Sequence, residues 1–68
     1  MNPEDLVADG LVTVKEAEEF LGIRRSKLYE LMERGELPYV KIGSARRIPK
    51  RALIALATKH LVSRNPLP

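Results

Sequence analysis

The chain has 68 residues, enough for one domain, and a chain of this size buries only about 60% of the surface that its unfolded form exposes. Hydrophobic residues at 44% and charged residues at 31% indicate a soluble folded domain rather than a disordered segment. The absence of cysteine excludes disulfides and thiolate metal sites, and the single histidine, His60, has no second imidazole with which to share a metal. We therefore expect no metal and no other cofactor.

The net charge of +3 is unevenly distributed. Residues 1–22 carry six acidic side chains and one basic one, whereas residues 23–51 carry nine basic and three acidic ones. A basic stretch of this kind is expected of a protein that binds a phosphate backbone, although many ordinary basic proteins share it. No apolar run approaches the roughly 20 residues that span a bilayer, and residues 1–10 are too polar for a secretory signal. We expect no membrane partner and a cytoplasmic location.

Residues 1–10 show no sustained period and are predicted to be a flexible lead-in. The first helix begins at Val14, because Thr13 and Glu16 have the spacing of a capping box, and it ends after about eight residues at Gly22. One face of this helix is expected to carry the apolar residues Val14, Ala17 and Leu21, with Phe20 alongside.

A second helix is predicted from Arg24 or Arg25 to Arg34, ending at Gly35. Leu28, Leu31 and Met32 form its apolar stripe. The opposite side carries Ser26, Lys27, Glu30, Glu33 and Arg34. Two short helices that share a core across a tight turn form the helix-turn-helix arrangement, in which the second helix presents its outer face. Short helical hairpins also occur in proteins that do not bind nucleic acid.

Residues 39–42 alternate with a period of two and predict a strand with Val40 and Ile42 inward. The turn follows at residues 43–44, and residues 46–48 form the returning strand. Pro49 suits the first turn of a third helix. One face of that helix is expected to carry Leu53, Leu56, Ala57, His60 and Leu61. The predicted fold is thus mainly α with a small β-hairpin, three helices plus a two-stranded wing in the order α-α-β-β-α, spanning residues 11–62 and followed by a frayed tail at residues 63–68.

The second helix offers candidate contacts for DNA, since arginine can donate two hydrogen bonds to guanine and serine and lysine readily bind phosphate. These candidates are Arg24, Arg25, Ser26, Lys27, Tyr29, Glu30 and Arg34. In the alternative interpretation this is a solvated helix face on which Glu30 pairs with Lys27 and Arg34. Tyr29 borders the apolar stripe, where its ring can pack in the core or its hydroxyl can reach a phosphate.

The tip of the hairpin offers a second set of candidates: Lys41, Ser44, Arg46 and Arg47. A tip that contains glycine can approach a phosphate backbone closely or place an arginine in a minor groove. The alternative is a charged strand edge that discourages aggregation.

Catalysis is not indicated. The chain has no phosphate-binding glycine loop, no nucleophile with a histidine and an acid in a known arrangement, and no carboxylate pair in an apolar setting. His60 is expected to be packed and hydrogen-bonded on its helix rather than to transfer protons. The acidic residues of the first helix are expected to form a solvated face or a surface for a basic partner protein.

The segment "VTVKEAEEFLGIRRSKLYELMERGELPYVKIGSARRIPKRALIAL" resembles the excisionase family of winged helix-turn-helix domains, in the superfamily of the mercury-resistance regulator. The likeness covers residues 11 to about 61, and its most specific part is "GELP" followed at once by a basic hairpin. The resemblance implies that the second helix enters the major groove and the wing contacts the neighbouring minor groove or backbone. Arg24, Arg25, Ser26, Lys27 and Tyr29 match the helix contacts, and Arg46 and Arg47 match the wing contacts.

Excisionases of this family bind beside an attachment site, bend the DNA and direct an integrase toward excision, without catalysis of their own. The resemblance therefore implies specific duplex DNA binding, with an integrase and further copies of the chain as partners and no small-molecule substrate. Since only residues 62–68 follow the third helix, a coiled-coil dimerisation helix is not expected, which favours this role over that of a small transcription regulator. A protein-interaction module that uses the acidic first helix is a third hypothesis.

Overall fold

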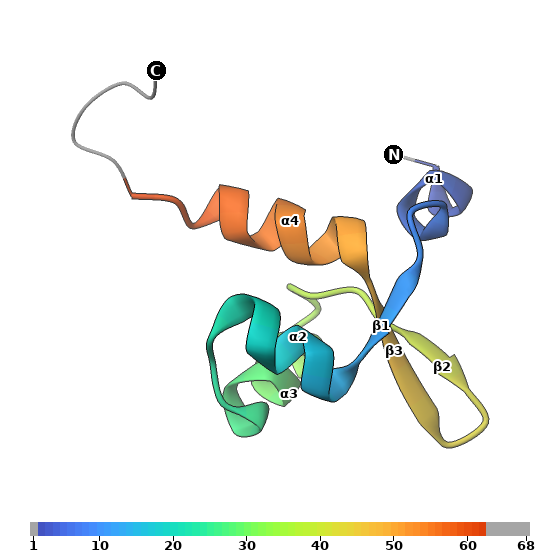
Figure 1. The fold of residues 1–68 in the computed structure, drawn as a ribbon, viewed down its shortest axis with the longest axis horizontal. Coiled ribbons are helices and arrows are strands. Elements are labelled where there is room, and N and C mark those ends of the chain that lie inside the picture. Colours follow the sequence, from blue (N-terminus) through green and yellow to red (C-terminus); the bar gives the residue numbers. More distant parts are fainter. Residues whose placement is uncertain (1, 63–68) are drawn as a thin grey trace.

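The computed structural model describes residues 2–62, in which four helices and three strands surround a small core (Figure 1). In chain order the elements are α1 (Pro3–Val7), β1 (Leu11–Thr13), α2 (Val14–Leu21), α3 (Arg25–Glu33), β2 (Val40–Ile42), β3 (Ala45–Pro49) and α4 (Lys50–Lys59). The winged helix-turn-helix class predicted from the sequence is confirmed. The expected fraying of residues 63–68 lies outside the described residues.

The capping box at the start of α2 is present as predicted. The Glu16 N–H donates to the Thr13 hydroxyl at 3.1 Å, and the Thr13 N–H donates to the Glu16 carboxylate at 3.0 Å. Both bonds satisfy amides that have no partner within the helix. The helix ends at Gly22, whose φ of 66° lies in the left-handed region that glycine adopts without steric cost.

The turn after α3 closes against the core. Gly35 has a φ of 77°, and the N–H groups of Glu36 and Leu37 donate to the carbonyl of Leu31 at 3.0 and 3.2 Å. This is a tight helix ending in which a left-handed residue lets the following amides reach back to the last turn. It directs Leu37 inward, where its side chain is almost wholly buried.

The sheet has a third strand that the sequence analysis did not predict. The strand order is β1-β3-β2, with β3 antiparallel to both neighbours. β1 pairs Leu11 with Pro49 and Thr13 with Arg47. Three residues are too few to show a period of two, so β1 was not distinguishable from the lead-in to α2. It holds the start of α2 against the central strand.

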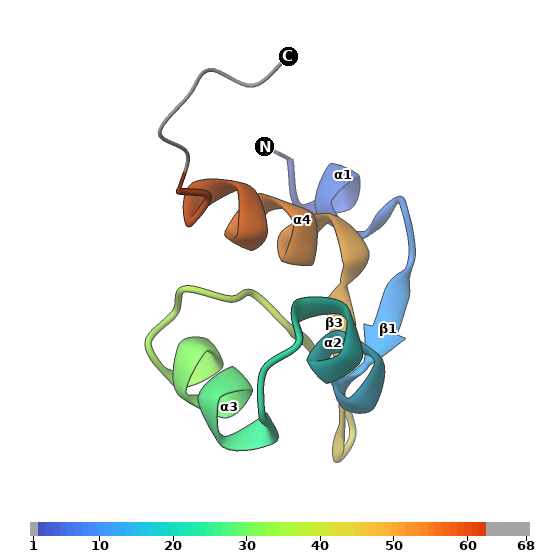
Figure 2. The ribbon, with the colours of Figure 1, turned by 60° about the vertical axis from the view of Figure 1, so that its left-hand side comes forward.

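The core lies where α2, α3 and α4 meet the sheet (Figure 2). Its buried side chains are Ala17, Leu28, Leu31, Met32, Leu37, Ile48, Ala52, Leu53 and Leu56. Ile48, near the end of the central strand β3, is fully buried. The apolar stripe predicted for the second helix is confirmed, since Leu28, Leu31 and Met32 are all buried.

The prediction that Val40 and Ile42 point inward is wrong. Ile48 is fully buried, and Arg46 shares its side of β3 because side chains two residues apart in a strand lie on the same face. Lys41 is the cross-strand partner of Arg46, so Lys41 and Tyr39 belong to the core side, and Tyr39 packs against the core. Ile42 is 62% exposed near the tip. The alternation was recognised correctly, but its phase was shifted by one residue.

The prediction for the last helix is only partly correct. Leu53 and Leu56 are buried, but Ala57, His60 and Leu61 are exposed. α4 ends at Lys59, and the core extends along it only as far as Leu56. Pro49 is the residue before the helix rather than part of its first turn.

Within the lead-in predicted to be flexible, residues 3–7 form a short helix, α1, which the sequence did not predict. The Asn2 side chain accepts from the Glu4 N–H at 2.9 Å, and Pro3 occupies the first helical position. Leu6 packs against the core cluster, and Arg51 of α4 pairs with Asp9 at 2.7 Å. α1 therefore lies beside α4.

The capping box predicts a specific dependence of stability on pH. The Thr13 N–H and hydroxyl, which bond with Glu16, hold the pKa of its carboxyl below the ordinary value of 4.5. A pKa lowered by folding stabilises the folded state above the ordinary pKa, and this stabilisation is lost as the pH falls through the lowered one. In urea titrations from about pH 7 to about pH 3, the advantage of the wild type over Glu16→Gln should disappear at the acid end.

Glu19→Gln is the matched control, because Glu19 is an exposed acid on the same helix without a capping role. If the wild type remained more stable than Glu16→Gln by the same amount at the acid end, the charge of Glu16 would not be what stabilises the cap.

Candidate nucleic-acid interface

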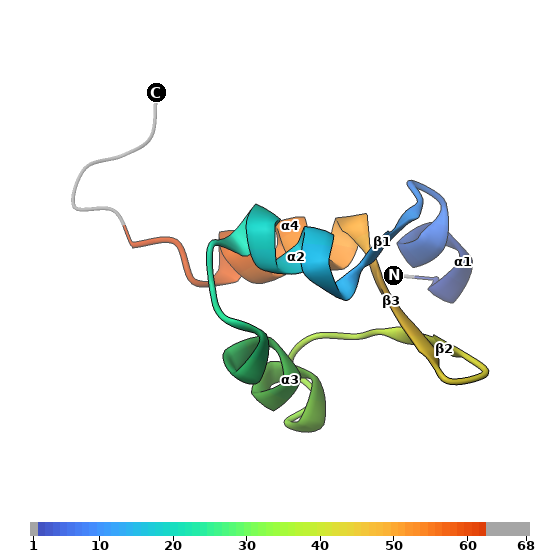
Figure 3. The same cartoon turned by 60° about the horizontal axis from the view of Figure 1, so that its bottom comes forward.

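The exposed side of α3 and the hairpin β2–β3 project to one side of the molecule, away from α4 (Figures 1 and 3). α3 can be exposed there because its apolar stripe is one-sided, so that its buried face packs on the core while Ser26, Glu30 and Glu33 remain exposed. The tight connection at residues 22–24 places α3 across the end of α2. The result is a helix-turn-helix with a hairpin beside its second helix.

The amino end of α3 is positively charged and has no side-chain cap. Its N-cap residue is Arg24, which makes no capping hydrogen bond, and the first turn contains no acidic residue. Arg24 forms no ion pair with another residue in the described part of the chain, whereas Arg25 is held by Glu18 of α2 at 2.8 Å. Basic residues at this end add to the positive end of the helix dipole instead of compensating for it.

Glu30 bridges two of the candidate bases on α3. Its carboxylate lies 3.3 Å from the Lys27 ammonium and 3.4 Å from the Arg34 guanidinium. The pairing considered as the alternative in the sequence analysis is therefore present. All three side chains are about half exposed, so the pairs contribute little to stability, about 0.5 kcal/mol or less each.

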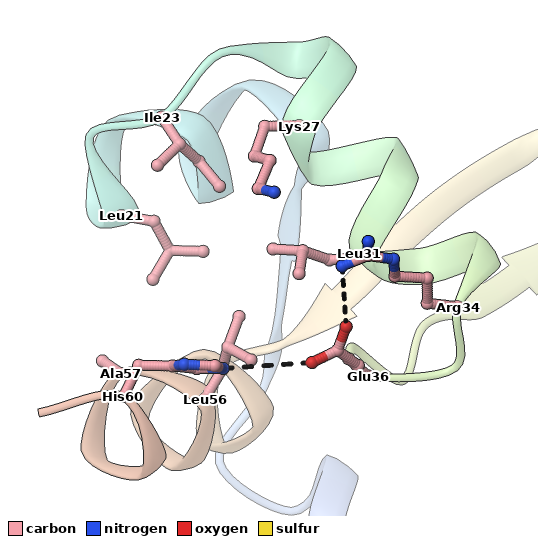
Figure 4. A pocket seen from close by; sticks show the side chains of 9 residues that line it. All are labelled: Leu21, Ile23, Lys27, Leu31, Arg34, Glu36, Leu56, Ala57 and His60. Atoms are coloured by element: carbon pink, nitrogen blue, oxygen red, sulfur yellow. Dashed lines mark hydrogen bonds and ion pairs between the residues drawn. The ribbon is translucent and has the colours of Figure 1, made fainter.

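Lys27 and Arg34 lie on the flank of α3 that faces α4 (Figure 4). They line an open groove of about 420 Å³ whose apolar wall includes Leu31 and Leu56. Glu36 also lines this groove, and its carboxylate lies 3.4 Å from the Arg34 guanidinium and 4.0 Å from the His60 imidazole.

The His60 side chain is 58% exposed, and its imidazole makes no hydrogen bond among the described residues, because its 4.0 Å contact with Glu36 is too long for one. The expectation of a packed, hydrogen-bonded histidine is therefore wrong. The physical reason is that α4 passes beyond the core before it reaches position 60.

Arg46 of β3 lies between two aromatic rings. Its guanidinium carbon is 4.9 Å from the centroid of Tyr29 on α3 and 4.7 Å from that of Tyr39, just before β2. Its Nη1 is buried, makes no hydrogen bond and lies 3.6 Å from a carboxylate oxygen of Glu33. Tyr29 and Arg46, which the sequence analysis treated as separate candidates, are thus in direct contact.

Arg47 lies on the opposite face of β3 from Arg46, because successive side chains alternate along a strand. It is half-buried, donates to the carbonyl of Arg46 at 2.8 Å, and its charge contributes to the lowered pKa of Glu16. Lys41 and Ser44 are exposed, and Lys41 forms no ion pair within residues 2–62. The structure therefore separates the four wing candidates into different surroundings.

Ile42 is a residue of this surface that sequence reasoning missed. It is exposed beside Gly43, between Lys41 and Ser44 of the hairpin tip. An exposed isoleucine among polar and basic residues can contact a sugar or wedge against a base step. Tyr39 packs against the core, and Ile42 lies three positions later, on the opposite face of an alternating strand. Recognition of Tyr39 as the inward residue could therefore have identified Ile42 as exposed.

The acidic residues of α2 do not form one free surface. Glu16 is engaged in the capping box and Glu18 holds Arg25, which leaves Glu19 beside the exposed Phe20. Within the described ranges, no cluster of three or more histidine, cysteine or acidic residues could hold a metal. No described helix has the length and apolar character required to cross a membrane.

A family model described as "Helix-turn-helix domain" matches residues 11–61. The chain belongs to this family. It is similar to a protein named "Probable excisionase" from Saccharopolyspora erythraea, with 40% identity over 55 residues, and the resemblance to the excisionase family is confirmed. The match covers 81% of this chain and 56% of that protein, so the chain spans little more than half of the length of its relative. No solved structure matches the chain.

Proposed function

We propose that this helix-turn-helix domain binds duplex DNA, with α3 in the major groove and the hairpin β2–β3 against the adjacent backbone or minor groove. The observation that carries the proposal is the position of the exposed face of α3 beside a basic hairpin, on the side away from α4. A helix with one free polar face fits the width of the major groove. Family membership supports the same mode of binding.

The amino end of α3 supplies the first contacts in this proposal. Arg24 and Arg25 extend from a helix end whose free N–H groups and dipole favour an anion, and Ser26 is exposed on the first turn. We assign phosphate contact to Arg24 and base or phosphate contact to Arg25 and Ser26. To bind the nucleic acid, Arg25 must break its ion pair with Glu18. Its contribution to the binding free energy is therefore smaller than that of an unpaired arginine.

Lys27, Glu30 and Arg34 form the second part of the proposed interface. Glu30 opposes a phosphate but accepts from cytosine N4, so its presence favours particular base pairs over others. Lys27 and Arg34 border the backbone on the flank toward α4. The pairs of Glu30 with Lys27 and Arg34 thus reduce affinity for arbitrary DNA. Sequences that place a suitable hydrogen-bond donor opposite Glu30 are bound in preference to others.

The hairpin supplies contacts that position the domain. Lys41 and Arg47 bind backbone phosphates, Ser44 adds a hydroxyl at the tip, and Ile42 contacts a sugar or base step. Such contacts depend weakly on sequence and depend strongly on salt. Tyr29 is assigned to the support of Arg46 instead of direct contact, because its ring faces that guanidinium.

The biological role proposed is that of an excisionase, a recombination directionality factor without catalysis of its own. It binds beside an attachment site, bends the DNA and directs an integrase to excision, with further copies of the chain on adjacent sites. The support is the similarity to a protein named as a probable excisionase. The finding that separates this role from transcription regulation is the location of the binding sites.

Capture of fragments from the source genome by the purified protein tests that role. Repeated sites clustered beside an integrase attachment site are expected. Enrichment only at promoters would replace the excisionase role with transcription regulation. No enrichment above that of a control protein in which Arg24, Lys41 and Arg47 are all alanine would overturn DNA binding and favour a protein-interaction module.

The salt dependence of binding tests the wing. Lys41→Ala and Arg47→Ala should each weaken binding to all duplexes and flatten the plot of log affinity against log salt by about 0.9 per lost phosphate contact. Lys59→Ala is the control, since Lys59 is an exposed base on α4 and should leave the slope unchanged. Equal slopes for Lys41→Ala and the wild type would remove Lys41 from the interface.

Glu30→Gln tests the internal pairing on α3. Loss of this carboxylate frees Lys27 and leaves Arg34 with Glu36 as its remaining partner, so affinity for random duplex should rise several-fold and the ratio of specific to random binding should fall. Fluorescence anisotropy with specific and random duplexes measures both. Glu4→Gln on α1 removes the same charge at an exposed site and should change neither. Unchanged random affinity in Glu30→Gln would show that Glu30 does not face DNA.

A further inference from the structure

Arg46 is the basic residue of the hairpin whose guanidinium has the least freedom to meet a ligand. The guanidinium carbon lies over the Tyr29 ring at 4.9 Å and over the Tyr39 ring at 4.7 Å, so that both rings are within cation–π distance of the charge. One edge faces Glu33, and its Nη1 is buried from solvent. The side chain is only 23% exposed, against 57% for Arg34 and 59% for Arg25.

The three side chains connect α3 to the hairpin, which no backbone hydrogen bond within residues 2–62 joins directly. Tyr29 belongs to α3, Tyr39 lies just before β2, and Arg46 belongs to β3. The pairings of β2 and β3 are with strands, and the backbone hydrogen bonds after α3 reach only its own last turn. The Tyr29–Arg46–Tyr39 stack is therefore a side-chain link between the second helix and the hairpin.

We propose that Arg46 is a positioning residue, which sets the orientation of the hairpin relative to α3 and does not contact a phosphate. This inference rests on the proposed DNA binding, for which the spacing of α3 and the hairpin must match the grooves. It also removes Arg46 from the wing contacts that the family resemblance suggested. In DNA binding Arg46 acts through Arg47 and Lys41, which its stack holds in place.

The geometry favours arginine over lysine at this position. A planar guanidinium stacks on two rings at once, while a lysine ammonium is a compact, strongly hydrated charge that cannot cover both. Arg46→Lys therefore retains the positive charge and loses the stack. A phosphate contact would behave differently, since lysine also binds phosphate.

The first measurement is made on the free protein. Because the chain contains no cysteine, spin labels can be attached at Ser26→Cys on α3 and Ser44→Cys at the hairpin tip, both of which are exposed. Double electron–electron resonance should give a narrow distribution of distances between the two labels in otherwise wild-type protein, and a broader or shifted distribution in Arg46→Lys. Arg47→Ala should leave the distribution narrow. An unchanged distribution in folded Arg46→Lys, with circular dichroism as the check of folding, would overturn the inference.

The second measurement is a double-mutant cycle on DNA affinity. Arg47→Ala should weaken binding on the order of tenfold in the wild-type background, but by less than about twofold when Arg46 is lysine. Two independent phosphate contacts would give factors that multiply, which would contradict a positioning role. Tyr29→Leu serves as the second variant, because it removes one ring and leaves the charge of Arg46, and it should reduce the Arg47 effect in the same way.

The two measurements separate this inference from the proposed function. If the wild-type protein shows no duplex affinity, the proposed function fails, and the distance distributions still report whether Arg46 orients the hairpin. If DNA binding is present but Arg46→Lys leaves both the distances and the Arg47 effect unchanged, only the positioning role fails.

Discussion

The burial of one stripe of α3 is the interaction on which the rest of the structure depends. Leu28, Leu31 and Met32 belong to a core that has nine buried hydrophobic side chains within residues 2–62. A core this small leaves little redundancy, so loss of one large aliphatic side chain costs about 2 to 5 kcal/mol in a domain whose total stability is of similar size. The same burial determines which residues of α3 remain exposed. Folding and the presentation of the polar face are therefore one event.

Local rules of backbone chemistry were sufficient to predict most of the helices. The capping box of Thr13 and the left-handed glycines at positions 22 and 35 are signals within a few residues, and each lies where it was expected. The strands were harder, because β1 depends on pairing with β3, far along the chain, and the phase of β2 depends on its pairing with β3 across the hairpin. Because the predicted alternation was shifted by one residue, Ile42 was placed on the core side, where the structure has Tyr39.

The candidate site was predictable as a set of residues but not as an arrangement. Sequence alone gave the excess of bases in residues 23–51, and it even suggested the pairing of Glu30 with Lys27 and Arg34. It could not show that Arg25 is held by Glu18, seven residues earlier, or that Arg46 lies between two tyrosines. Composition counts charges, whereas the fold decides which of them already have partners.

That distinction bears on how strongly one domain can hold DNA. Because four of the candidate bases are engaged with acids of the same chain, the release of counterions by a single domain is smaller than its charge suggests. When such a base leaves a carboxylate and binds a phosphate, the net gain in binding free energy is only the difference between two similar interactions. In the proposed mode of DNA binding, a single domain is therefore expected to bind arbitrary duplex weakly, which limits trapping at unrelated sites. In the proposed excisionase role, occupancy at the intended site comes from base contacts and from adjacent copies or a bound recombinase, whose contributions multiply when the geometry lets them engage together.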